Sequence, residues 1–186
     1  MRLPESSDGL WRARVEDYAR HVADLRSRSY EGTLDRKDKE EAFVRAFEIT
    51  TPLARRVLED VSHWYLAGTG TGATNLPSGD GHGGLAGSWA VTWPLLEADR
   101  NRVTGEELRP VCLWAIFPME WTHPHLALMS GGEPAFAWPF QVTSEDDAAR
   151  QEPVLRVMAE AELHDRIYCA RSNWAVLPDN FGSIAG

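Results

Sequence analysis

The chain has 186 residues, of which 43% are hydrophobic and 25% are charged. These proportions are typical of a globular chain with one domain and a sizeable core. The formal net charge is −9, and a field of this sign argues against nucleic acid and against a membrane surface as partners. The two cysteines, Cys112 and Cys169, are too few for a disulfide scaffold. The sequence has neither an apolar run of signal-peptide length at its start nor a run of about 18 apolar residues, which predicts a cytoplasmic protein.

Three helices are predicted in the first third of the chain. Asp8 can cap the first helix, whose apolar residues recur at steps of four and three and should face the core. These residues are Trp11, Val15, Tyr18, Val22 and Leu25. A second helix is expected around residues 42–47. A third should begin at Thr51 and Pro52, because threonine can cap free amides and proline is tolerated at the first helical position.

His63 lies in the predicted third helix, outside the apolar face of that helix. Its neighbours on the helix surface include Glu59 and Asp60, so we expect an exposed imidazole near a carboxylate. A functional role for His63 requires that this polar side of the helix meets another part of the fold.

Residues 68–87 contain eight glycines in 20 residues and predict a long loop outside the core. The phosphate-binding and dinucleotide-binding patterns are both missing, so no nucleotide is assigned to this segment. A loop of this length is usually either disordered or functional. Two alternatives are therefore open, a disordered segment or a lid over a pocket. His82, with glycine on both sides, is expected in solvent.

Extended segments begin at Ser88. Strands are expected in residues 88–96, 110–117, 125–129 and 135–142. The second of them is apolar on both alternating faces, which favours a central strand. Because proline cannot donate to a strand ladder, Pro118, Pro124 and Pro139 should mark strand ends, bulges or edges.

Ser144 has the pattern of a capping box, and Pro153 should restart or kink the helix that continues to about Ile167. The inward face of that helix is predicted from Val154, Val157, Met158 and Ala161, with Asp165 inside the arc and His164 at its edge. Residues 166–177 predict a final strand.

Together these elements predict an α+β fold, in which N-terminal helices pack on a curved, mostly antiparallel sheet and one further helix precedes the last strand. We expect a single domain over residues 1–186. Its helical part should cover about residues 8–67, followed by the glycine-rich loop 68–87 and by the sheet with its helix in residues 88–178.

The segment WTHPHLAL, residues 121–128, holds the clearest chemical pattern. A strand would point His123 and His125 to the same side, and neutral imidazoles in that arrangement suit zinc or non-haem iron. The site needs a third ligand. Candidates are His164, Asp165, His63 and Glu133. The alternative is a pair of histidines that hydrogen-bond at a strand edge with no metal or other cofactor.

Eight tryptophans are more than a small core needs, and most of them lie in or beside the predicted strands. They suggest an apolar pocket for a small organic molecule. Its lining would include Trp89, Trp114, Trp121, Trp138 and Trp174. The polar and catalytic groups would be His123, His125, Asp165, Tyr168 and Arg171. The structural alternative is that the tryptophans simply fill the core or an interface.

The sequence therefore predicts a small-molecule enzyme with a tryptophan-lined pocket and a histidine-based polar end, which holds Zn or Fe in the first interpretation. A second interpretation is a cofactor-free acid–base enzyme of the cyclase, isomerase or hydratase type. The third is a binding or assembly protein without catalysis, whose apolar sheet face forms a homodimer interface. An enzyme is favoured by the paired imidazoles, by the inward His164 and Asp165 and by the possible lid.

Overall fold

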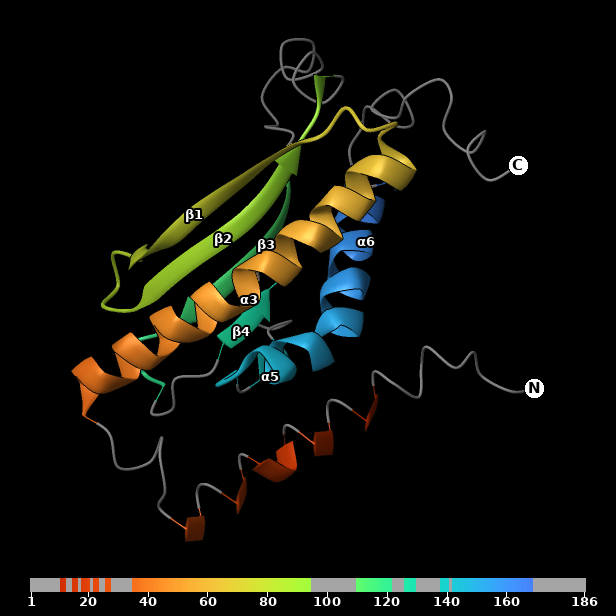
Figure 1. Cartoon of the computed structure of the whole chain (residues 1–186). Coiled ribbons are helices and arrows are strands. Elements are labelled where there is room, and N and C mark those ends of the chain that lie inside the picture. The colour runs from red at the N-terminus through yellow and green to blue at the C-terminus, as the bar shows by residue number, and fades with distance from the viewer. Residues whose placement is uncertain are drawn as a thin grey trace.

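The computed structural model describes residues 11–12, 15–16, 18–20, 22–23, 26–27, 35–94, 110–121, 126–129, 138–140 and 142–168. The elements, in chain order, are α3 (Arg36–Tyr65), β1 (Thr71–Gly79), β2 (Leu85–Thr92), β3 (Val111–Phe117), β4 (Leu126–Met129), β5 (Trp138–Phe140), α5 (Glu145–Arg150) and α6 (Glu152–Tyr168). Helices α3 and α6 contact each other and both pack on the sheet (Figure 1). The predicted α+β class is confirmed.

The sheet has the strand order β1-β2-β3-β4-β5, and each neighbouring pair is antiparallel. The apolar strand β3 lies at the centre, as predicted. Pro118 follows the end of β3, and Pro139 lies in β5, an edge strand among the strands described. Both prolines therefore occupy positions where a missing N–H group is tolerated. Pro124 lies outside the described residues.

The core lies between α3, α6 and one face of the sheet. Alternation along β3 buries Val111, Leu113, Ala115 and Phe117 on that face. On the neighbouring strand, the ring of Trp89 stacks on Phe47 of α3, with 4.3 Å between the ring centroids and 10° between the planes. The indole Nε1 of Trp89 donates a hydrogen bond of 2.9 Å to Thr51 Oγ1. The largest side chain of β2 is thus fixed to α3 by both packing and a polar contact.

The prediction of separate second and third helices was wrong, because α3 runs through Pro52 without a break. Thr51 does not act as an N-cap. Its hydroxyl donates to Phe47 O, and that of Thr50 donates to Ala46 O, each at 2.8 Å. Apolar residues on both sides of Pro52 pack on the same sheet, so burial of one continuous face outweighs the lost N–H group of proline.

The prediction of a long loop at residues 68–87 was also wrong, since this segment forms β1, a tight turn and the start of β2. The backbone of β1 pairs with β2 from Thr71 to Gly79, with a register shift between Asn75 and Ser78 that accommodates Pro77. In the turn, the Asp80 carboxylate accepts hydrogen bonds from the N–H groups of His82 and Gly84. Backbone pairing, rather than apolar side chains, orders this segment.

The predicted start at Ser144 is confirmed, because its side chain accepts from the N–H of Asp147 at the first turn of α5. The chain then restarts at Glu152, so that Pro153 lies in the first turn of α6. Residues 166–168 continue α6, so the final strand does not begin at residue 166 as predicted.

The inward face of α6 differs from the predicted face. The buried residues are Val154, Leu155, Met158, Ala159, Glu162 and Leu163. Val157 is 50% exposed, and Ala161 and His164 are also exposed. The helix is rotated so that Leu155 and Leu163 are buried, because these large apolar side chains gain more from burial than alanine does.

The described residues between 11 and 27 are helical, as predicted. Four of the apolar residues predicted to face the core are exposed instead, and the fifth, Leu25, lies outside the described residues. Trp11 is 66% exposed, Val15 62%, Tyr18 47% and Val22 39%. These four residues are called the exposed stripe below. Among the helices described, none combines the length and the apolar character needed to cross a lipid bilayer.

Candidate functional site

The predicted histidine pair lies outside the described residues. The same holds for Arg171 and Trp174. His123 and His125 precede β4, whose first described residue is Leu126. The described part of the chain contains no group of three or more histidine, cysteine, aspartate and glutamate side chains that could hold a metal ion. The zinc or iron site at His123 and His125 stays a prediction.

The predicted partners of this pair on the last helix are placed differently. His164 is exposed rather than directed into the core, so its predicted inward position was wrong. Tyr168 ends α6 instead of lying in a final strand. Asp165 belongs to the last turn of the same helix, but the orientation of its side chain lies outside what the structure describes.

The tryptophans predicted to line one pocket lie on different sides of the sheet. Trp89 is fully buried in the core, whereas Trp114 belongs to the opposite face of β3 and is 38% exposed. Trp121 is partly buried against the core. Trp138 pairs with Leu128 in the β4–β5 ladder. Trp89 therefore fills the core, which was the structural alternative for the tryptophans, and it does not share a cavity with Trp114.

A groove with a volume of about 580 Å³ lies between the C-terminal half of α3 and the β1–β2 hairpin. Its α3 wall consists of Arg55, Leu58, Glu59, Ser62 and His63. Its opposite wall consists of small residues, Gly68, Gly70, Gly72, Ala73, Thr74, Ala90 and Val91. Of the described residues that line the groove, none is a tryptophan, so this site differs from the predicted aromatic pocket.

Three ionisable side chains of α3 follow the groove at intervals of four residues. Arg55, Glu59 and His63 lie on one side of the helix, about 6 Å apart along its axis. All three are exposed. In the described part of the protein, none of them makes a side-chain hydrogen bond or an ion pair. The rings of His63 and Trp64 are in a T-shaped contact, with 4.8 Å between centroids.

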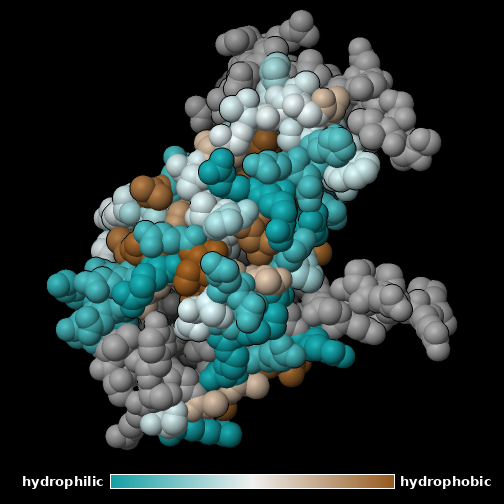
Figure 2. Space-filling model, viewed as in Figure 1, coloured by the Kyte–Doolittle hydropathy of each residue, from teal (hydrophilic) through white to brown (hydrophobic). Residues whose placement is uncertain are grey.

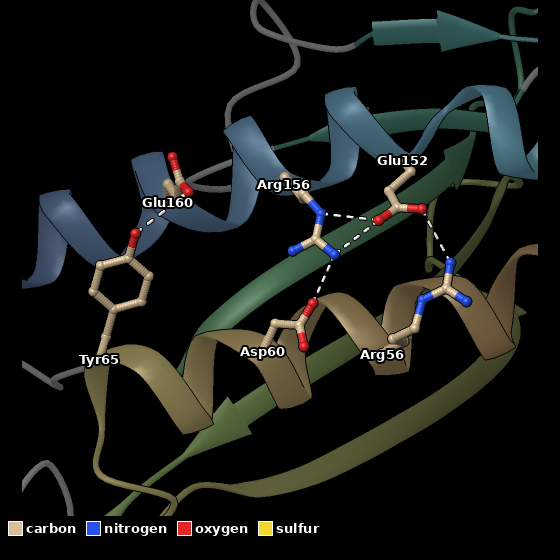
Figure 3. Close-up of polar contacts among 6 residues, drawn as sticks. All are labelled: Arg56, Asp60, Tyr65, Glu152, Arg156 and Glu160. Atoms are coloured by element: carbon tan, nitrogen blue, oxygen red, sulfur yellow. Dashed lines mark hydrogen bonds and ion pairs between the residues drawn. The ribbon is translucent and has the colours of Figure 1, made fainter. Parts of the chain in front are cut away.

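The neighbouring polar row of α3 is fully engaged by α6 (Figure 3). Arg156 donates to Asp60 at 2.6 Å and to Glu152 at 2.7 Å. Glu152 also accepts from Arg56 at 3.0 Å. Tyr65 points toward Glu160, and burial together with the negative charge of Glu160 raises the pKa of Tyr65. This row joins the two helices, whereas the row of Arg55, Glu59 and His63 lines the groove.

The end of the groove is set by the connection from α3 to β1. The N–H group of Gly70 donates to Ser62 Oγ at 2.9 Å, and the N–H groups of Leu66 and Gly68 donate to Ser62 O. Ser62 is 7% exposed. A methyl group on Gly70 would lie 2.6 Å from Ser62 Oγ. The hairpin thus approaches α3 as closely as a glycine backbone allows and closes one end of the groove.

Sequence reasoning found His63 but missed the groove. The predicted exposure of His63 is confirmed, and the condition set for a functional role is met because the polar side of α3 faces the hairpin. The four-residue spacing of Arg55, Glu59 and His63 was a usable signal. It was missed because the opposite wall had been interpreted as a loop. Comparison with models of protein families, with curated proteins and with solved structures found no match for this chain.

Proposed function

We propose that the protein binds a small organic anion in the groove between α3 and the β1–β2 hairpin, and that Glu59 and His63 act on it as acid and base. In this proposal the protein is a small-molecule enzyme of the cofactor-free acid–base type. A single observation carries it: Arg55, Glu59 and His63 line a hollow and make no polar side-chain contact within the described part of the protein.

The chemistry of the row supports an anionic ligand with an apolar portion. The guanidinium of Arg55 keeps its positive charge and can donate two parallel hydrogen bonds to a carboxylate or phosphate. A carboxylate and an imidazole one helical turn apart can divide proton removal and proton donation between them. Leu58 and Val91 supply apolar contact, and the lack of side chains at Gly68, Gly70 and Gly72 leaves room for the ligand.

Other oppositely charged side chains of α3 form ion pairs, unlike Arg55 and Glu59. At the same spacing of four residues, Arg36 donates to Glu40 at 2.7 Å, and Lys37 lies 3.8 Å from Glu41. Arg55 and Glu59 have this spacing too, but they form no ion pair. Exposed pairs contribute at most about 1 kcal/mol. A ligand that contacts both side chains therefore displaces no strong internal interaction.

The test is a screen of small carboxylates and phosphates against the full chain by ligand-observed NMR, followed by titration of the strongest ligand. Arg55→Gln should weaken binding at least tenfold, because it removes the charge-assisted hydrogen bonds. Arg56→Gln is the matched control, since Arg56 is the next residue and faces α6 instead of the groove. Equal affinities of the two variants would overturn the proposed site.

Acid–base catalysis is tested separately from binding. The bound compounds and their close analogues are incubated with the protein in the presence of a chelator, and proton exchange with D₂O is followed by NMR. Glu59→Gln and His63→Asn should each lower the exchange rate by at least a hundredfold while ligand affinity changes much less. Binding without exchange would reduce the proposal to a non-catalytic binding protein. The proposal of a metal at His123 and His125 is independent of this groove, and metal analysis of protein purified without an affinity tag tests it.

A further inference from the structure

The N-terminal helical segment is attached to the rest of the protein through its polar side. Arg20 Nη1 donates to Asp147 Oδ1 at 2.9 Å, and the Asp147 side chain is only 8% exposed. At about 100° per residue, Arg20 lies between about 140° and 180° around the helix from every residue of the exposed stripe. The ion pair with α5 therefore lies on the side of the segment opposite to the exposed stripe.

The exposed stripe places large apolar side chains at the surface. Exposed fractions of 66% at Trp11 and 62% at Val15 leave most of both side chains in water. In Figure 2, brown and tan side chains run along the lower edge, where the N-terminal segment lies in Figure 1. Apolar patches of this kind commonly mark an interaction surface.

Two arginines lie along one side of the exposed stripe. Arg12 and Arg26 lie within about 60° of Val15 around the helix, and both are exposed. Glu16 lies farther toward the polar side, at about 100° from Val15. Arginine can lay its aliphatic stem along apolar surface while its charge reaches outward. An apolar face next to basic residues is typical of helices that lie in a membrane interface.

We propose that the exposed stripe binds an anionic lipid surface, with the N-terminal helix in the plane of the interface and Arg12 and Arg26 at the level of the headgroups. Net charge alone predicts the reverse, since the chain carries −9. Charges more than about 8 Å apart are largely screened at physiological ionic strength. Arg20 contacts α5 on the side of the helix opposite to the exposed stripe. In this arrangement Arg12 and Arg26 are closer to the lipid than the acidic residues of α5 are.

A second copy of the chain fits the exposed stripe less well. The steps of four and three would allow two such helices to pair. In that arrangement Arg12 and Arg26 of both copies would border the same seam, where like charges repel. Anionic headgroups instead attract the same arginines, and this charge complementarity favours the lipid surface. The proposal does not depend on the groove at α3.

The experiment is vesicle flotation of the full chain with two lipid compositions, phosphatidylcholine alone and phosphatidylcholine with about one third phosphatidylserine. We expect binding to the anionic vesicles that decreases as salt is raised. The double variant Arg12→Gln, Arg26→Gln should bind about 25-fold more weakly, at about fivefold for each arginine near an anionic surface. Absence of binding, or equal binding to both compositions, contradicts the proposal.

Substitutions in the exposed stripe test its contact with lipid. Val15→Ser and Trp11→Ser should each reduce binding at least tenfold, since they remove the apolar contact. Leu76→Ser is the matched control, because Leu76 is 71% exposed but belongs to β1, and it should bind as the wild type does. Urea unfolding verifies that each variant is folded. Sedimentation equilibrium gives the competing outcome: self-association that Val15→Ser abolishes, without vesicle binding, would assign the exposed stripe to a second copy and overturn the proposal.

Discussion

Gly70, directly before β1, lies tightly against Ser62 of α3. An added methyl group would lie 2.6 Å from Ser62 Oγ and 2.7 Å from Val91 Cγ2, closer than side-chain contacts allow. Ser62 is buried and holds the connection between the two elements through Gly70 N–H. The sequence identifies Gly70 only as one of eight glycines in a short segment. Its contact with a residue eight positions earlier depends on the fold.

Gly70→Ala is expected to lower the free energy of unfolding by about 1–3 kcal/mol, because the methyl group must displace packed neighbours. Urea denaturation followed by circular dichroism measures the change. Gly72→Ala is the control: the nearest atom to its added methyl group is Ala90 O at 3.9 Å, so its effect should stay within about 1 kcal/mol. Similar losses for both variants would show that the contact with Ser62 is not the cause.

Helix α3 shows which parts of an element can be predicted from the sequence. Periodic apolar residues predicted helices on both sides of Pro52. The extended pattern from Ser88 predicted β2, and the apolar run of residues 110–117 predicted β3. The Thr51–Pro52 pair wrongly predicted the start of a new helix. A threonine before proline also fits a helix interior, where its hydroxyl donates to the carbonyl four residues earlier, here Phe47 O. The strand β1 could not be predicted, since its order depends on backbone pairing with β2.

Pro52→Ala is expected to raise the free energy of unfolding by about 1–3 kcal/mol. Alanine supplies the N–H group for Glu48 O and removes the clash of the proline ring with that carbonyl. Chemical denaturation compares the variant with Glu48→Ala, another exposed position in the same helix, which should change stability by about 0.5 kcal/mol or less. A destabilised Pro52→Ala would indicate that α3 needs the proline bend to pack on the sheet and on α6 together.

At the scale of the whole molecule, the α+β class and the central position of β3 followed from the sequence, whereas the candidate site did not. The groove forms between two different kinds of element from separate parts of the sequence, a polar helix face and a glycine-rich strand. The placement of the N-terminal helical segment likewise involves a long-range contact, since Arg20 forms an ion pair with Asp147 of α5. Periodicity identified its apolar side but carried no information on which side faces the protein.

Asp147 connects this N-terminal helix to α5 and should make the stability of the protein depend on pH. Burial by itself would raise the pKa of Asp147, but hydrogen bonds from the Thr143 hydroxyl and N–H groups and the charge of Arg20 outweigh it and lower the pKa below its usual value. Arg150 also donates to this carboxylate. A carboxyl group with a lowered pKa stabilises the folded state above its unfolded pKa, and that contribution is lost as the pH falls through the folded pKa.

Asp147→Asn is therefore expected to lower the free energy of unfolding at pH 7 by about 1–3 kcal/mol, through loss of charge-assisted hydrogen bonds to a buried acceptor. The difference from the wild type should be constant down to about pH 4 and should shrink at lower pH, where the wild-type carboxylate becomes protonated. Urea denaturation at a series of pH values measures it. Asp146→Asn serves as the control, since Asp146 is the exposed neighbour on the same turn. A difference that stays the same from pH 7 to pH 2 would mean that the charge of Asp147 does not stabilise the contact between α5 and the N-terminal helix.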